Sequence, residues 1–323
     1  MKKGIRISGS PLRLLDKGRI KKSIFLHLKL VLVLLLGMRV LGYAQAGQSG
    51  LAFLKLGVGA RSLAMSEAAV ASANDPSATY YNPAGLRFAN NPQLLVMHKE
   101  WIQGTQTEFL AASLPSGLFS FGFHMNATSI PDIEIRQRPG PADGTFSARN
   151  VAIGGSAAYS IDSTISIGAT VKYLYEKILV DETFGIGMDV GGVYRSPWDI
   201  TFGASLSNVG SMGKLRTESS KLPTTLRLGA SRAAPVGSLD GKATLEADVV
   251  SVLPEKTMHL LLGGEFTYDN TFSLRAGYVT GYDTRNVTAG VGLHYDIVTI
   301  DYAYVPFRLD LGTTHTFSVG FEF

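Results

Sequence analysis

From about residue 92 to its end, the chain alternates between apolar and polar side chains in one run after another. A two-residue period places successive side chains on opposite faces of a β-strand. The runs lie at 92–101, 105–114, 117–127, 149–160, 165–175, 184–194, 198–206, 222–234, 245–249, 258–266, 272–278, 287–295, 298–304 and 314–323. They predict 14 strands, and no helical periodicity follows residue 90.

Each predicted strand has one apolar face and one face that carries charge. Segments of this length are typical of transmembrane strands, and only a closed sheet satisfies every backbone hydrogen bond in lipid. A soluble sandwich is the alternative, but its strands would seldom all be so long. We therefore predict an all-β protein, a transmembrane antiparallel β-barrel of about 14 strands. The side chains expected to line its wet lumen are Lys172, Asp189, Arg227, Glu246, Glu265, Arg275 and His294.

The connections between the predicted strands offer an independent test. If the last strand ends in the periplasm, the periplasmic turns are 114–117, 160–163, 195–198, 234–242, 268–271 and 296–298. The outer loops are then 101–105, 127–149, 177–183, 208–222, 254–257, 281–286 and 305–313. The two longest connections both fall in the outer set, which is the outer-membrane pattern.

The first 46 residues have the order of a secretory signal peptide. Ten Lys and Arg accompany one acid, Asp16, and an apolar stretch from Ile24 to Leu41 follows. Its uninterrupted part, Leu30–Met38, is shorter than the roughly 20 residues that cross a bilayer, which disfavours a transmembrane anchor. We predict that residues 1–46 are a Sec signal peptide, which is cleaved at Ala44 or Ala46. Because the basic region is long, the position of the true start codon stays open.

The last strand, Thr314–Phe323, ends on an aromatic residue at the chain terminus. Phe317, Val319, Phe321 and Phe323 share its apolar face. The strand resembles the C-terminal strand that the barrel assembly machinery of Gram-negative bacteria recognises. Phe321 and Phe323 are therefore the predicted assembly signal, and the outer membrane is the predicted location.

Composition removes several classes of function. The chain has no Cys, so disulfides and thiolate metal sites are excluded. Its net charge of +4 comes from the export segment, because residues 47–323 carry 20 basic and 25 acidic side chains. Nucleic-acid binding is therefore not expected.

Sequence motifs of enzymes are also missing. Gly185 and Gly187 lack the third glycine of a dinucleotide-binding loop and lie in mid-strand. The histidines are scattered without ligand spacing, and nothing indicates the nucleophile of a luminal His–Asp–Ser set. We expect no enzymatic activity, no metal and no cofactor.

Residues 47–90 differ from the rest because small residues dominate them. A short helix near 62–72 and a turn at Asn82–Gly85 are expected. Small side chains suit a hatch that fills a confined lumen, whereas a periplasmic tail or a first strand pair would be the alternatives. The predicted organisation is a signal peptide (1–46), an N-terminal hatch (47–90) and an outer-membrane β-barrel (91–323).

Both ends of the mature chain resemble the PorV/PorQ family of outer-membrane proteins. The segments that carry the resemblance are Phe53–Arg61 (FLKLGVGAR), Ala69–Asp75, Tyr81–Leu86 (YNPAGL), Asp301–Phe307 (DYAYVPF), Asp310–Gly312 and Thr314–His315. That family is related to FadL-type barrels, which have 14 strands and a hatch with an Asn-Pro-Ala motif. The resemblance implies a hatch motif at Arg61, Asn82, Pro83, Ala84 and Gly85. The chain departs from the family pattern at Ser66-Glu67, where small glycines are common, and at Arg308-Leu309.

The resemblance implies two competing functions. In the first, the barrel is an accessory of type IX secretion that receives secreted proteins through their C-terminal sorting domains, with contacts on Ala127–Arg149 and Asn208–Leu222. In the second, it is a FadL-like transporter of hydrophobic small molecules, and a diffusion porin ranks third. An apolar outer pocket would favour the transporter. Leu110, Leu114, Leu118 and Phe119 are candidates for its lining, although contact with membrane lipid is the preferred interpretation of these residues.

Overall fold

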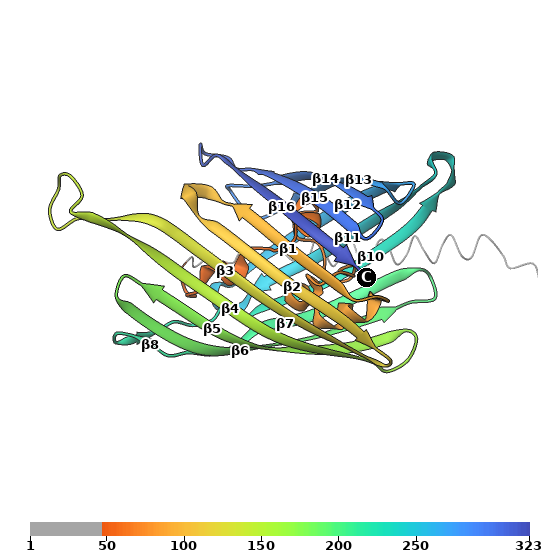
Figure 1. Cartoon of the computed structure of the whole chain (residues 1–323), viewed down its shortest axis with the longest axis horizontal. Helices are drawn as coiled ribbons and strands as arrows, with labels where there is room; N and C mark the ends of the chain where they lie inside the picture. Colours follow the sequence, from red (N-terminus) through yellow and green to blue (C-terminus); the bar gives the residue numbers. More distant parts are fainter. Residues whose placement is uncertain (1–46) are drawn as a thin grey trace, which may run out of the picture. The chain divides into compact units, whose positions relative to one another are not determined.

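The computed structural model describes residues 47–323, so the predicted signal peptide lies outside the described part of the chain. A closed antiparallel barrel of 14 strands makes up most of it, which confirms the predicted fold (Figure 1). The barrel strands are β1 (Gln93–Glu100), β2 (Gln106–Ser116), β3 (Phe119–Ile135), β4 (Gly144–Ser160), β5 (Ile165–Ile178), β6 (Asp181–Arg195), β7 (Ile200–Met212), β10 (Thr225–Val236), β11 (Gly241–Val252), β12 (Thr257–Tyr268), β13 (Phe272–Val279), β14 (Val287–Tyr295), β15 (Val298–Pro306) and β16 (Thr313–Glu322).

Neighbours along the chain are neighbours in the sheet, and β1 pairs with β16 to close it. The register of that seam sets Gln93 opposite Glu322 and Glu100 opposite His315. A separate two-stranded hairpin, β8 (Lys214–Leu215) with β9 (Glu218–Ser219), stands in the connection between β7 and β10. Closure leaves no strand edge unpaired, as a lipid environment requires.

The two ends of the barrel differ in their connections. The turn end has the short connections 117–118, 161–164, 196–199, 237–240, 269–271 and 296–297, and the C-terminal Phe323 lies there, with its amide donating to Pro92 O. The loop end has 101–105, 136–143, 179–180, 213–224, 253–256, 280–286 and 307–312. Both sets match the predicted turns and loops. The predicted loop 127–149 was too long, because β3 and β4 extend as a paired hairpin to Ile135 and Gly144.

Along each barrel strand, apolar side chains face outward and alternate with side chains that face the lumen, as expected from the sequence. On β5, Ile167, Val171 and Tyr173 are exposed on the outside, while Thr170 and Lys172 are buried inside. The exposed apolar side chains of the other strands continue this outer surface around the barrel. An apolar exterior on a closed sheet is the lipid-facing surface of a transmembrane barrel.

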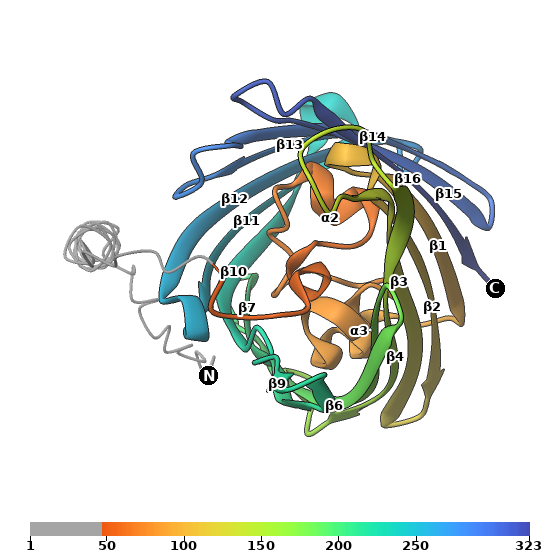
Figure 2. The ribbon, with the colours of Figure 1, turned by 90° about the vertical axis from the view of Figure 1, so that its left-hand side faces the viewer.

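The N-terminal segment (residues 47–90) lies inside the barrel (Figure 2). Its short helices are η1 (Ala52–Lys55), α2 (Ala60–Ala64), α3 (Ala78–Tyr81) and η2 (Pro83–Phe88), and three more 3₁₀ turns, η3 (Ile102–Gly104), η4 (Gly237–Leu239) and η5 (Leu253–Glu255), stand in connections. Within residues 47–323, each helix is too short or too polar to cross a membrane.

The segment runs along the lumen from the loop end to the turn end. Near its start, Gly50 N donates to Lys221 O in the 213–224 connection, and it joins β1 at the turn end. The helix expected at 62–72 stops at Ala64, because Ser66 and Glu67 have left-handed φ values of 57° and 67°. Glycine adopts such angles most readily, which gives a physical reason for the glycines that are common at these two positions in the PorV/PorQ family.

Eight inward-facing glycines bring the wall close to the segment. A Cβ added to any of them would lie within 3.0 Å of an atom of residues 64–84. They are Gly122, Gly168, Gly191, Gly203, Gly229, Gly263, Gly277 and Gly290, each on a different strand. The interior is therefore packed around the segment, with a buried cluster that includes Leu63, Tyr81, Leu86, Met97 and Phe109.

Candidate functional site

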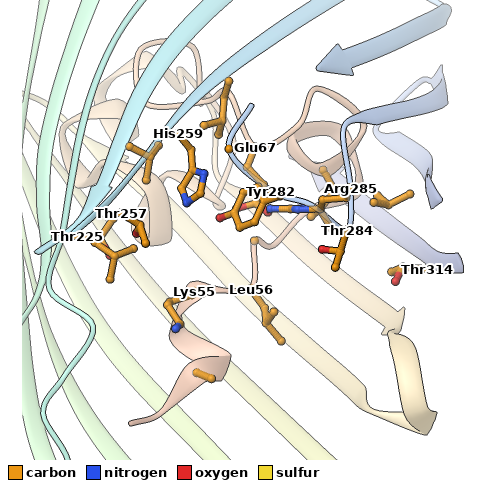
Figure 3. A pocket seen from close by; sticks show the side chains of 18 of the residues that line it. Lys55, Leu56, Glu67, Thr225, Thr257, His259, Tyr282, Thr284, Arg285 and Thr314 are labelled. Atoms are coloured by element: carbon orange, nitrogen blue, oxygen red, sulfur yellow. The ribbon is translucent and has the colours of Figure 1, made fainter. Parts of the chain in front are cut away.

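A cavity of about 480 Å³ lies near the loop end, between the N-terminal segment and the barrel wall (Figure 3). The segment supplies its floor through residues 52–57, 63 and 67, and β1, β10, β11, β12 and β15 supply its wall. Loops 253–256 and 280–286 form its rim. Segments far apart in the sequence therefore line one cavity.

Much of the lining is apolar. Leu56 and Leu63 face it from the segment, and Val250 and Leu261 face it from β11 and β12. At the rim Trp101 packs edge-to-face on Phe307, with ring centroids 6.2 Å apart. A mainly apolar pocket with a few polar groups is the usual form of a small-molecule site.

One buried carboxylate, Glu67, lies on the cavity floor among cationic side chains. Arg285 Nη2 donates to Glu67 Oε1 at 2.9 Å, and Arg227 Nη2 lies 3.8 Å from Glu67 Oε2. Burial alone would raise the pKa of the Glu67 carboxyl, but the charges of Arg285 and Arg227 outweigh it and hold the pKa below its usual value. Glu67 is therefore ionised at neutral pH and joins the segment to the wall and to loop 280–286.

Two further polar contacts stand around the cavity. Lys99 Nζ, buried on β1, donates to Gly57 O at 2.8 Å. Glu255 accepts from both Lys55 and Ser49, which fixes the start of the segment to loop 253–256. Each contact ties the segment to the wall and leaves the apolar lining free to meet a ligand.

A stacked aromatic pair forms one side of the cavity. The rings of His259 and Tyr282 are parallel to within 2°, with centroids 3.9 Å apart. His259 Nδ1 donates to Thr280 O at 3.0 Å, which sets the plane of the imidazole. The guanidinium of Arg285 lies 4.8 Å from the Tyr282 ring centroid, so loop 280–286 reaches the cavity through two side chains.

Most of the residues predicted to line a wet lumen make ion pairs elsewhere. Arg61 donates twice to Glu265 at 2.9 Å, Arg275 donates to the same carboxylate at 2.6 Å, and Arg275 also reaches Asp301 at 2.6 Å. Lys172 pairs with Asp189 at 2.7 Å on the opposite wall. These pairs hold the wall and the segment together, and of the predicted luminal set only Arg227 lines the cavity.

The remaining predicted luminal residues contact backbone or a neighbouring strand. Glu246 accepts from Ala71 N at 2.8 Å, and Asp248 two residues further on accepts from the amides of Ala69 and Val70. His294 is half-buried near the turn end and contacts Thr299 Oγ1 through Nδ1 at 2.9 Å. Neither group is part of the cavity lining.

The Asn-Pro-Ala motif is packed deep in the lumen and does not line the cavity. Asn82 Nδ2 donates to Val70 O at 2.8 Å and to Gly192 O at 3.1 Å, and its Oδ1 accepts from Ala84 N at 3.2 Å. Pro83 and Ala84 lie against Gly168 of β5. Gly85 is required because an added Cβ would lie 2.5 Å from Ala73 O. The motif therefore docks the segment on the wall.

The two C-terminal phenylalanines stand apart from the cavity, on the outer face at the turn end. Phe321 is opposite Leu94 of β1 and Val298 of β15, and Phe323 is 66% exposed. The residues considered for an outer pocket do not line the cavity, in agreement with the preferred interpretation that they contact lipid. Leu114, Leu118 and Phe119 are exposed on the outside beside the β2–β3 turn, as lipid contact requires.

Sequence reasoning missed the principal cavity residues, Glu67, Arg285, Tyr282, His259 and Lys99. One signal was present, since Ser66-Glu67 is one of the two places where the chain departs from the pattern of the PorV/PorQ family that it resembles. Among residues 47–323, no group of three or more His, Asp or Glu is placed to hold a metal ion. The arrangement suits binding of a ligand with an apolar body.

Comparison with known proteins gives a family match and a fold. Residues 43–183 match a family described as "Uncharacterised protein family (UPF0164)", and no curated protein sequence matches the chain. The chain is similar to the CymD monoaromatic hydrocarbon channel, at 13% identity and a TM-score of 0.59, over 83% of this chain and 98% of that one.

Two further solved structures have the same fold. The Pseudomonas putida toluene transporter TodX is 14% identical with a TM-score of 0.56, over 82% of this chain and 96% of TodX. A Pseudomonas aeruginosa FadL homologue is 12% identical with a TM-score of 0.53, over 82% and 98%. At such low identities the likeness establishes a FadL-like barrel and leaves ligand and partner to be argued from the site.

Proposed function

We propose that this protein is an outer-membrane channel for hydrophobic small molecules, and that the loop-end cavity is where they first bind. The observation that carries the proposal is that cavity, apolar over much of its lining and placed above a packed segment. The names of the similar structures, a monoaromatic hydrocarbon channel and a toluene transporter, support the same class of ligand. No catalytic step is proposed.

The packed segment defines the route that a ligand would have to take. Residues 64–84 pack closely against wall glycines between the cavity and the turn end, so in our proposal they block direct passage along the lumen in this conformation. A ligand must leave after the segment moves, or sideways through the wall into lipid. In either case the cavity comes first on the path from outside.

A tryptophan in the cavity allows ligand binding to be measured directly. The chain has two tryptophans, Trp101 at the cavity rim and Trp198 on the outer face at the turn end. In a Trp198→Phe background, the emission of Trp101 alone reports the cavity. We expect toluene and longer hydrocarbons to change it saturably, whereas a linear, unsaturable response would contradict a binding site.

A matched pair of variants tests whether the cavity is the site. Leu261 faces the cavity, while its neighbour Leu262 is exposed on the outer face. Leu261→Phe should weaken binding and should also lower hydrocarbon uptake by cells whose lipopolysaccharide limits passage. Leu262→Phe should leave both unchanged, and equal effects of the two variants would refute the assignment.

The secretion role is the second candidate, reversing the order expected from the sequence. It rests on the resemblance to PorV/PorQ alone, and the similar structures described above are channels. Purification of the tagged protein from native outer membranes separates the two. Recovery with surface proteins that share a C-terminal sorting domain would favour secretion, and recovery alone with bound hydrophobic molecules would favour transport.

A further inference from the structure

Loop 280–286 bends inward over the cavity, and few contacts hold it there. Gly281 has a φ of 81°, which permits the sharp turn that follows β13. Beyond it, Tyr282 stacks on His259 and Arg285 donates to Glu67 (Figure 3). The other hydrogen bonds of the loop lie mostly at its two ends. Thr280 bonds to Leu260 and His259 of β12, and Thr284 and Asn286 accept from the backbone and the side chain of Arg308.

The partner of Arg285 is fixed in the barrel. Glu67 belongs to the turn at residues 65–68, where Gly263 and Gly277 of the wall leave no room for even a Cβ. Ser66 N also donates to Thr288 Oγ1 of β14 at 3.0 Å. Because Glu67 cannot follow a moving loop, any outward swing of loop 280–286 must break its hydrogen bond with Arg285.

Tyr282 covers an apolar part of the lining. Val250 and Leu261 of the wall pack with Ala68 and Val279 in one buried cluster, and Tyr282 packs against that cluster. Val250 is only 6% exposed although it lines the cavity. Removing Tyr282 from this position would join the apolar cluster to the open cavity.

We propose that loop 280–286 is a gate over the inner part of the cavity and that the Glu67–Arg285 pair is its latch. With the latch closed, Tyr282 shields Val250 and Leu261. When the latch breaks, the loop swings toward the outside and the apolar wall becomes accessible. The gate acts whichever ligand the channel takes, so its test needs no transport measurement.

Thiol labelling can measure the gate, because the chain has no cysteine of its own. Val250→Cys places a probe behind Tyr282, and Thr257→Cys places one at the rim. Folded, heat-modifiable protein in detergent would be labelled with a small water-soluble maleimide from solution. We expect Arg285→Met to speed labelling at Val250→Cys by roughly 10- to 100-fold, the factor that corresponds to one charge-assisted hydrogen bond.

The controls separate a gate from general loosening. Arg216→Met removes an exposed cation that pairs with Asp181 of β6 and does not line the cavity, so it should leave the rate at Val250→Cys unchanged. Labelling at Thr257→Cys should be equally fast in all of these proteins. Glu67→Gln should reproduce Arg285→Met if it folds, and the double variant should add nothing further, as expected for two members of one latch.

The proposal is overturned if Val250→Cys is labelled no faster in the Arg285→Met protein than in the Arg216→Met protein. It is also overturned if Arg285→Met speeds labelling equally at both probe positions, since that would mean a general opening of the fold. A ligand that fails to bind would contradict the proposed function and would leave these labelling results unaffected.

Discussion

Gly168 of β5 is where the wall most directly meets the backbone of the Asn-Pro-Ala motif, and its replacement by alanine tests how firmly the segment is docked. The added Cβ would lie 2.6 Å from both Pro83 C and Ala84 N. These are main-chain atoms, so no side-chain rotation relieves the clash. Moving them out to the 3.4 Å of ordinary contact requires a shift of about 0.8 Å.

That shift acts on the hydrogen bonds that hold the motif. Asn82 bonds to Val70 O, Gly192 O and Ala84 N at 2.8, 3.1 and 3.2 Å. Loss of one of these bonds costs roughly 1 kcal/mol and overpacking adds roughly 1–3 kcal/mol, so Gly168→Ala should weaken docking by about 2–4 kcal/mol. The barrel strands themselves should remain paired.

Hydrogen exchange of the amides in residues 60–90 measures docking directly. Exchange there should rise by roughly one and a half to three powers of ten in Gly168→Ala. Gly155→Ala is the matched control, because Gly155 lies on the outer face of the adjacent strand and its added Cβ would meet nothing within 4 Å. Equal exchange in the two variants would refute rigid docking of the motif on the wall.

Three further predictions follow from the ends of the chain and from the latch. Replacing Phe321 and Phe323 together by Ala should lower the amount of heat-modifiable barrel in the outer membrane, with Phe317→Ala, on the same outer face, as the control; unchanged assembly would remove their role as a signal. Deleting residues 47–90 should lower the unfolding midpoint and raise ion conductance in planar bilayers, because the wall loses its packed interior; unchanged conductance would count against a plug. Because the pKa of Glu67 is lowered, its stabilising contribution is present above the usual glutamate pKa of about 4.3 and is lost as pH falls through the lower folded value. Labelling at Val250→Cys, relative to labelling at Thr257→Cys, should therefore stay constant from pH 7 to 5 and rise only in stronger acid; a relative rise between pH 7 and 5 would show that another group controls the gate.

The barrel could be predicted from the sequence because alternation is a local signal with a global consequence. The assignment of each connection to the turn end or the loop end followed from counting the strands back from the C-terminus. Boundaries were harder, since β3 and β4 continue well past the residues that look like strand, and the helix near Ser62 ends early on two left-handed residues. The end of this helix would have been visible in the sequence if glycines had stood at the two left-handed positions.

The cavity could not be predicted in the same way. Glu67 and Arg285 are 218 positions apart, and each is an isolated charge in the sequence. Arg61 was predicted as part of the hatch motif and Arg227 as a luminal charge, yet only Arg227 reaches the cavity, while Arg61 pairs with Glu265. Which inward charge meets which depends on the path of the segment through the lumen, and that path is set by wall glycines whose role appears only in three dimensions.

The buried contacts of the segment also constrain how the molecule can be assembled. Glu246 and Asp248 direct carboxylate oxygens at main-chain amides of residues 69–71, and a wall formed without the segment would leave those buried oxygens without these donors. The same wall lacks side chains at eight positions where the segment fills the space. In the full-length chain, the segment should therefore lie against the sheet before β1 meets β16, whereas a chain without the segment would close around a lumen filled with water.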